Sequence, residues 1–175
     1  MKKSYSQICK DIKSIKIQGA RNVAKAGLQA YQLKPTKASK KKLLSLRPTE
    51  PMLHYVLNLA EKQPISTILS HFQEAQDKIN IQVNKLIKSN DIIFTHCHST
   101  NVTNALIYTK KKGKKFQVYN TETRPLFQGR KTARELKKAK IKVTIFIDSA
   151  MAIALEKKQG TKKVTKIMIG ADALT

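Results

Sequence analysis

Cysteine, acidic residues and long apolar runs are all scarce in this chain of 175 residues. Its two cysteines, Cys9 and Cys97, lie far apart in the sequence, which excludes a disulfide-rich scaffold and suits a reducing compartment. No apolar run approaches the roughly 18 residues that a membrane-spanning helix needs, and the first residues lack the apolar core of a signal peptide. We therefore expect a soluble cytoplasmic protein with no membrane contact.

The charge is strongly unbalanced, because 11 acidic residues stand against 35 basic ones and the formal net charge is +24. A basic surface attracts phosphate and releases counterions on binding, which raises the question of nucleic acid. The excess consists of 30 lysines and only 5 arginines, and the lysine runs lack the interleaved aromatic residues that stack on bases. The pattern favours a lysine-rich solvated surface, and no motif supports contact with RNA.

The first half of the chain has a helical pattern. With 41% hydrophobic residues, the chain can bury a core in one ordinary domain or two small ones. Up to about residue 88, apolar residues recur every three or four positions, as in amphipathic helices. One such segment runs over residues 15–31, and Pro35 and the Arg47-Pro48 pair interrupt the pattern. Further helices are expected up to residue 46 and over 52–62 and 65–88.

After residue 90, short runs of β-branched residues alternate with helical segments. We expect strands at residues 91–95, 116–119, 142–147 and 164–169, and helices at 100–112, 128–140 and 150–158. Such alternation indicates βαβ units with right-handed crossovers and a parallel sheet. The sequence therefore predicts an α/β fold: a helical domain over residues 1–89, then a Rossmann-like parallel-sheet domain over residues 90–175.

The chemistry of such a fold is expected just beyond the carboxyl ends of the strands, where open parallel sheets bind their ligands. The four segments that follow the predicted strands supply a thiol, carboxylates, an arginine and several hydroxyl groups. They are residues 95–99, 120–125, 148–150 and 170–172. A purely structural domain has no need to gather these groups on one edge.

Cys97 is the most informative of these residues. It follows a predicted strand and precedes a predicted helix, whose N-terminal dipole favours a thiolate able to act as a base or nucleophile. One alternative is a cysteine that is simply a small buried apolar residue. Another is a metal site with His96 and His98, but consecutive strand residues point to opposite faces and no Cys-x-x-Cys completes the ligand set. We expect no metal and no cofactor.

Two aspartates are candidate partners of this thiol. Asp172 follows the last predicted strand, and a carboxyl group in a closed site can donate a proton near neutral pH. The alternative role is that of a helix cap or turn residue. The same alternative is stronger for Asp148, which begins a predicted helix and is assigned a supporting role.

Phosphate binding is the role considered for the remaining candidates. Arg47 and Arg124 each precede a proline in a loop, and arginines on restrained backbone suit a bidentate phosphate clamp, although a surface ion pair explains them equally well. Gly19 and Ala20 would let backbone approach a phosphate closely, or would serve helix packing.

These residues also form motifs that resemble a known family, the translation initiation factor 2B α/β/δ-like superfamily. The resemblance runs from about residue 10 to the C-terminus, and the TETRP and DSA segments are its most specific parts. In chain order the motifs are IQGAR at residues 17–21, RPT at 47–49, FTHCHS at 94–99, VYNTETRPLFQG at 118–129, DSA at 148–150 and GAD at 170–172.

The superfamily contains both enzymes and regulatory subunits. The chain most resembles the archaeal ribose-1,5-bisphosphate isomerases, which form ribulose 1,5-bisphosphate in AMP and nucleoside salvage. By that resemblance, Cys97 is the proton acceptor and Asp172 the proton donor. The resemblance further implies a sugar-phosphate site at Gln18, Gly19, Ala20, Arg21, Arg47, Ser99, Thr100 and Asn101, with Glu122, Arg124 and Asp148 in support. The alternatives are a non-catalytic regulatory subunit and a methylthioribose-1-phosphate isomerase.

The chain departs from the family pattern in two places. Family members usually have Arg-Gly-Ala-Gly where this chain has Gln18 to Arg21, so one cation has moved. They also continue well past the Gly-Ala-Asp motif, whereas this sequence stops at Thr175. The resemblance therefore implies a chain that lacks the C-terminal part of its family and works as a homo-oligomer, a dimer or hexamer, or with a companion chain that supplies the missing part.

Overall fold

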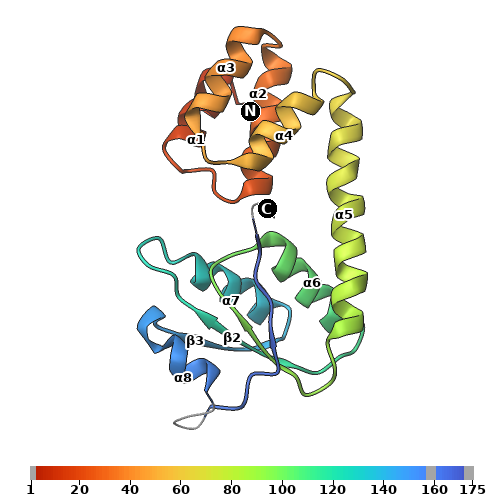
Figure 1. Ribbon diagram of the computed structural model, residues 1–175, viewed down its shortest axis with the longest axis vertical. Coiled ribbons are helices and arrows are strands. Elements are labelled where there is room, and N and C mark those ends of the chain that lie inside the picture. The colour runs from red at the N-terminus through yellow and green to blue at the C-terminus, as the bar shows by residue number, and fades with distance from the viewer. Residues whose placement is uncertain (1–2, 157–160, 172–175) are drawn as a thin grey trace. The chain divides into compact units, whose positions relative to one another are not determined.

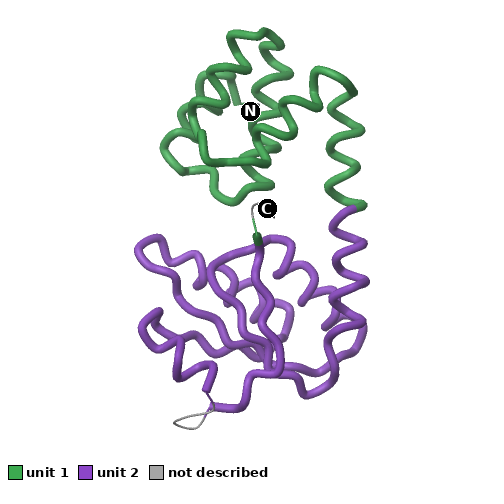
Figure 2. Tube along the Cα trace, viewed as in Figure 1, with its two compact units in different colours: residues 1–74, 171–175 green, residues 75–170 purple. Residues whose placement is uncertain are grey.

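The computed structural model describes residues 3–156 and 161–171 and divides the chain into two compact units (Figures 1 and 2). Unit 1 comprises residues 1–74 and 171–175, and unit 2 comprises residues 75–170. The division falls inside one long helix, whereas the sequence places the domain boundary between residues 89 and 90, after that helix. Among the described residues, no helix has the length and apolar character needed to cross a membrane.

Unit 1 is built from short helices. They are α1 (Tyr5–Lys13), α2 (Ala20–Leu33), α3 (Lys37–Leu46), α4 (Pro51–Leu59) and the first part of α5 (Ile65–Leu86). Their starts follow ordinary capping rules, since the side chains of Ser4 and Thr36 accept hydrogen bonds from backbone N–H groups three residues later, and Pro51 opens α4. The core of the unit is aliphatic, with Ile12, Leu28, Leu43, Leu53 and Leu57 fully buried.

The predicted helix over residues 15–31 is wrong in its first five positions. The chain leaves α1 through Ile15, whose φ of 59° is left-handed, and α2 begins only at Ala20. The Ile17 amide donates to the Asp11 carbonyl at 3.1 Å, and the Ile17 side chain packs on the helical core from this turn. The apolar residues of this turn therefore have the spacing expected of a helix although the segment is not helical. The preceding helix, α1, lies further towards the N-terminus.

Unit 2 contains a four-stranded sheet in the order β3-β2-β1-β4, with every neighbouring pair parallel. Its strands are β1 (Ile92–Thr95), β2 (Gln117–Thr121), β3 (Lys142–Phe146) and β4 (Lys166–Ile167). This arrangement confirms the predicted α/β class. The helices α6 (Thr100–Lys111) and α7 (Gln128–Lys138) pack with the end of α5 on one face, while the short α8 (Met151–Leu155), which follows the 3-10 turn η1 (Asp148–Ala150), packs on the other (Figure 1).

The last predicted elements are shorter in the structure. The predicted strand over residues 164–169 reduces to Lys166–Ile167, and the predicted helix over 150–158 becomes η1 and α8. Residues 157 and 158 of that helix lie outside the described residues. The amides of Thr165 and Met168, one residue beyond each end of β4, still donate to the β1 carbonyls of Ile92 and Phe94.

Gly129 fixes the position of α7 against the sheet. A Cβ atom at this residue would lie 1.7 Å from the carbonyl oxygen of Thr121 at the end of β2. The Asn120 side chain, fully buried on β2, donates to the Gly129 carbonyl at 2.7 Å. Only glycine permits this approach, so the first turn of α7 touches the carboxyl end of β2 directly.

Asp91 joins the start of β1 to β4. Its carboxylate, 9% exposed, accepts from the Lys88 amide at 2.6 Å, the Thr165 hydroxyl at 2.8 Å and the Lys166 ammonium at 2.7 Å. Burial alone raises the pKa of Asp91, but the hydrogen bonds from Lys166, Lys88 and Thr165 together outweigh it and hold the pKa below its usual value. The ionised form is thus the one that the folded state favours.

The first prediction concerns this carboxylate and pH. Because the folded-state pKa is depressed, Asp91 stabilises the fold above its unfolded pKa of about 4, and this contribution disappears as the pH falls through the folded pKa. Asp91→Asn should therefore lower the melting temperature most at pH 7, and the gap from the unmodified protein should narrow below about pH 4. Glu74→Gln, at an exposed position, is the control and should show no such gap. An equal gap at pH 7 and pH 3 would contradict the assignment.

Candidate functional site

The carboxyl ends of the strands in unit 2 carry the side chains that the sequence singles out. Beyond β1 lie Cys97 and Ser99, beyond β2 lies the segment that starts at Glu122, and Asp148 follows β3. Because the strands are parallel, these segments emerge at the same edge of the sheet. The structure thus gathers most of the unit 2 candidates on one rim.

Cys97 is a half-buried free thiol in an unusual backbone conformation. Its φ of 61° is left-handed, which is rare for a residue with a side chain. This conformation costs free energy and persists only where the surrounding structure imposes it. Two residues later, Ser99 caps α6, and its hydroxyl oxygen accepts from the Val102 amide at 3.4 Å. The thiol therefore sits at the turn between β1 and the N-terminus of a helix, as the sequence predicts.

Thr132 of α7 holds this turn in place. Its hydroxyl is buried and donates to the Cys97 carbonyl at 2.8 Å, and its oxygen lies 2.9 Å from Nδ1 of His98. The hydroxyl has a single proton, which it gives to the carbonyl, so Nδ1 of His98 must be the donor to Thr132. Burial, and then the charge of Lys131, lower the pKa of His98, so the imidazole is neutral at pH 7. A chain of two hydrogen bonds thus fixes the backbone of Cys97.

Two carboxylates clamp the loop that follows β2. Asp148 accepts from the backbone amides of Thr123 and Arg124, both at 2.8 Å. Glu122, 4% exposed, accepts from Nε of Arg124 at 2.8 Å and from Nη2 of Arg130 at 2.7 Å. The loop is therefore tied both to the end of β3 and to the start of α7.

The pKa values of both carboxyl groups are held below their usual range. For Glu122 the main cause is the hydrogen bond from Arg124, followed by that from Arg130. For Asp148 the backbone hydrogen bonds from Arg124 and Thr123 lower the pKa, which opposes burial. Both groups are ionised at neutral pH and act as acceptors, so they orient the loop rather than donate protons.

The two histidines beside Cys97 serve different neighbours. Nδ1 of His96 lies 2.5 Å from the Thr121 hydroxyl, whereas His98 contacts Thr132. Among the described residues, no group of three or more His, Cys, Asp or Glu side chains could hold a metal ion. The three consecutive residues therefore do not share a ligand position.

Gly170 brings the end of β4 against Ser99. A Cβ atom at Gly170 would lie 2.5 Å from the Ser99 hydroxyl oxygen and 2.7 Å from its Cβ. The segment that leads to Asp172 therefore passes over the N-terminus of α6. Asp172 itself, the expected proton donor, lies outside the described residues.

The remaining candidates belong to unit 1. Gly19 has a left-handed φ of 84° and precedes the first residue of α2, Ala20, while the Gln18 carbonyl accepts from the Asn22 side chain. The guanidinium of Arg21 lies 5.7 Å from the centre of the Phe72 ring. Arg21 is the cation that this chain has in place of the usual family arginine, and the stacking on Phe72 engages its charge.

One nitrogen of the Arg47 guanidinium has no hydrogen-bond partner among the described residues. Its Nη2 lies 3.5 Å from the buried Glu50 carboxylate, in agreement with the ion-pair alternative. Its Nη1 is buried, and no described residue forms a hydrogen bond with it. A buried guanidinium nitrogen without a partner is costly, and an anion would satisfy it.

Sequence reasoning missed Thr132, Thr121 and Arg130, and it did not foresee what His98 binds. A signal for Thr132 was present, since it shares the buried face of α7 with Gly129 and Leu136 and is the polar member of that stripe. A hydroxyl at such a position needs a partner across the helix interface. The partner could not be identified from the sequence.

Comparisons with known proteins agree with these motifs. The family model described as the Initiation factor 2 subunit family matches residues 7–175. The chain is 28% identical over 189 residues to a ribose 1,5-bisphosphate isomerase of Archaeoglobus fulgidus, covering 94% of this chain and 58% of that protein. It is 29% identical to a putative translation initiation factor eIF-2B subunit 2-like protein of Pyrococcus furiosus, covering 97% and 66%. It is also 29% identical to a methylthioribose-1-phosphate isomerase of Thermosipho africanus, covering 97% and 59%.

Solved structures show the same fold. The translation initiation factor eIF-2B of Pyrococcus horikoshii superposes with a TM-score of 0.82 at 22% identity, over 98% of this chain and 67% of that one. A chain of the tetrameric eIF2B-beta2-delta2 complex of C. thermophilum gives a TM-score of 0.72 at 14% identity, over 99% of this chain and 67% of that one.

This chain spans less than two thirds of the length of the three curated relatives named above.

The second prediction tests the role of Thr132. Thr132→Val leaves the Cys97 carbonyl and the His98 donor without partners, so it should destabilise the protein by about 1–3 kcal/mol and change the rate at which the Cys97 thiol reacts with a disulfide reagent. Thr132→Ser keeps the hydroxyl and should restore that rate. Thr109→Val is the matched control, because the equally buried Thr109 hydroxyl bonds no described residue. Similar effects at positions 109 and 132 would contradict the proposed role.

Proposed function

Because the chain belongs to the Initiation factor 2 subunit family, we propose that it acts in an aldose–ketose isomerisation of a sugar phosphate, with ribose 1,5-bisphosphate as substrate and ribulose 1,5-bisphosphate as product. Curated relatives support this proposal, since those that match over nearly the whole chain include ribose 1,5-bisphosphate isomerases from several organisms. Their names concern longer proteins, so the activity of this chain is part of the proposal.

The single observation that carries the proposal is the placement of Cys97. An isomerase of this kind needs a base that removes a proton from one sugar carbon and an acid that returns a proton at the neighbouring carbon. The Cys97 thiol follows β1 at the carboxyl ends of the strands, where open parallel sheets generally bind ligands, and Thr132 donates a hydrogen bond to the carbonyl of its turn. We assign Cys97 as proton acceptor and Asp172 as proton donor.

Phosphate binding at the start of α6 fits the same scheme. The first amides of a helix have no partner within the helix and carry a partial positive charge, which makes them a natural cradle for phosphate. Ser99 caps this helix and is followed by Thr100 and Asn101, of which Asn101 is exposed. We propose that these three residues contact one phosphate of the substrate.

We assign the second set of phosphate contacts to unit 1. The free Nη1 of Arg47 is the strongest support, because it is a buried cationic donor without a partner among the described residues. The left-handed Gly19 precedes the N-terminus of α2, and the segment from Gln18 to Arg21 supplies backbone there. Arg21, stacked on Phe72, belongs to the same segment.

A non-catalytic regulatory subunit is the second candidate function. Two observations favour it: the similarity to an initiation factor eIF-2B subunit 2-like protein, and the displaced arginine at position 21. A methylthioribose-1-phosphate isomerase is the alternative enzyme. We also propose assembly into an oligomer or with a companion chain, which a multisubunit structural relative supports.

The third prediction is the assay for the proposed reaction. The purified chain should convert ribose 1,5-bisphosphate to ribulose 1,5-bisphosphate, and Cys97→Ala or Asp172→Asn should lower kcat by about 10²–10⁴-fold. Cys9→Ala is the matched control, because Cys9 is buried in the helical core of unit 1 and should leave kcat unchanged. Methylthioribose 1-phosphate is assayed in parallel, and the oligomeric state is measured by light scattering on the same samples.

The outcomes separate the candidate functions. Turnover of methylthioribose 1-phosphate alone would assign the alternative enzyme. Absence of turnover with either sugar phosphate, together with no rise in melting temperature when they are added, would favour the regulatory subunit. Turnover that persists in Cys97→Ala would remove Cys97 from the mechanism.

The fourth prediction concerns Arg47. Lysine keeps the charge but loses the planar fork, so Arg47→Lys should raise KM for ribose 1,5-bisphosphate about tenfold with a smaller effect on kcat. Arg134→Lys on α7 makes the same chemical change away from the proposed phosphate contacts and should leave KM unchanged. Equal KM values for the Arg47 variant and the unmodified protein would show that Arg47 binds no phosphate.

A further inference from the structure

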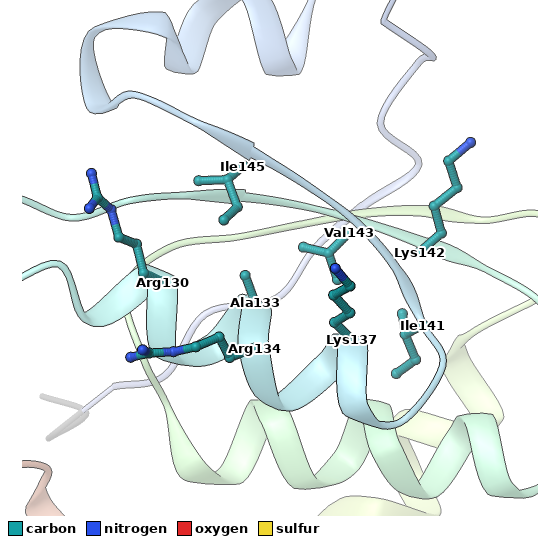
Figure 3. Close-up of a pocket in the computed structure, with 8 residues that line it drawn as sticks. All are labelled: Arg130, Ala133, Arg134, Lys137, Ile141, Lys142, Val143 and Ile145. Carbon is teal, nitrogen blue, oxygen red and sulfur yellow. The ribbon is translucent and has the colours of Figure 1, made fainter.

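A groove lies between α7 and the edge strand β3 and extends along β3 as far as Ile145. It encloses a hollow of about 720 Å³ (Figure 3). One wall comes from α7 and the other from β3 and the residue before it. The lining residues are Arg130, Ala133, Arg134, Lys137, Ile141, Lys142, Val143 and Ile145.

The floor of the groove is aliphatic. Val143 and Ile145 are alternate residues of β3, so their side chains leave the same face of the strand towards α7, and Ile141 just before the strand extends this apolar row. Ile141 is buried and Val143 packs on the core beneath, but Ile145 is 47% exposed. A large β-branched side chain on the wall of a hollow, half in water, favours an apolar ligand there.

The rim of the groove is cationic. In Figure 3 the charged ends of Arg134 and Lys142 extend away from the aliphatic floor, and Lys137 of α7 adds a third positive charge to the lining. None of these three forms an ion pair within the described chain, and no acidic residue lines the groove. Arg130, by contrast, is committed to Glu122. The rim therefore offers three positive charges to a ligand.

The backbone at this groove is also available. The sheet order puts β3 at an edge, where it pairs with β2 on one side, and no strand of the described chain pairs with its other side. An exposed edge presents unpaired N–H and C=O groups that an extended peptide can complete. A ligand that lies along β3 can thus gain main-chain hydrogen bonds as well as apolar and ionic contacts.

We propose that this groove binds an extended acidic segment of a partner protein, with apolar and acidic side chains at alternate positions. The segment adds a strand to the edge of β3, and its apolar side chains rest on Val143 and Ile145 on the α7 face. Its carboxylates lie on the opposite face, where they meet Lys142, while Arg134 and Lys137 attract them at longer range. Charge, apolar surface and free backbone all point to the same occupant.

Two other occupants fit less well. Single-stranded RNA would meet the charges, but the floor has no aromatic ring on which a base could stack. A second copy of this chain carries only 11 acidic residues against 35 basic ones, so its surface repels a cationic rim. The acidic partner segment is the occupant that uses every feature of the groove.

The experiment uses the full chain and three fluorescent probes. The first is a nine-residue peptide in which Glu alternates with Val or Ile, the second has the same composition in two blocks, and the third is oligouridylate. Binding is followed by fluorescence anisotropy at two salt concentrations. The variants are Arg134→Glu with Lys137→Glu, Ile145→Thr, and the matched control Lys41→Glu with Lys42→Glu on exposed positions of α3.

The alternating peptide should bind, and more tightly than the blocked one. The reversal at positions 134 and 137 should raise its Kd about tenfold or more. Ile145→Thr should raise it about fourfold, because it removes apolar contact while keeping β-branching. The control at positions 41 and 42 should bind as the unmodified protein does. Unchanged melting temperatures show that each variant folds.

Four results would overturn the proposal. The alternating peptide could fail to bind, or the blocked peptide could bind equally well, in which case alternation and the strand edge play no part. An equal loss in the control at positions 41 and 42 would reduce the effect to net charge. Binding of oligouridylate that depends on Arg134 and Lys137, without peptide binding, would assign the groove to nucleic acid.

Discussion

Parallel pairing of the four strands is the constraint on which the rest of unit 2 depends. After each strand a crossover must return the chain to the end of the sheet where the strands begin. The carboxyl ends of the strands therefore all lie on the same rim. That geometry brings together side chains as distant in sequence as Cys97 and Asp148. It also leaves β3 as an edge strand, so the rim and the cationic groove both follow from the strand order.

The rim is organised by two ionised carboxylates, of which Glu122 is buried and Asp148 half-buried. Glu122 is buried between two arginines, and Asp148 is placed against two backbone amides. Removing one member of such a pair leaves the other without its ion-pair or hydrogen-bond partner. The interactions that hold the loop after β2 therefore depend on one another. Its acidic groups hold the shape of this loop, and beside them the rim carries the free thiol of Cys97.

Much of this organisation could be predicted from the sequence, because strand–helix alternation and capping residues are local signals. The parallel sheet and the position of Cys97 before α6 followed from them. The turn at Ile15 did not, since a side chain that packs from a loop has the same spacing as one on a helix. Thr132 was missed because its partner is fixed by the packing of α7 on the sheet. The groove was missed for the same reason, as its walls are joined only by tertiary contact.

The hydrogen bond from Thr132 reaches the carbonyl of Cys97 and makes no use of its sulfur. The shape of the turn is therefore independent of the group that would perform chemistry there. A lineage can exchange the sulfur for another small side chain while keeping the turn, the cap of α6 and the loop after β2. Loss of the sulfur alone therefore need not carry a penalty in folding that selection would notice.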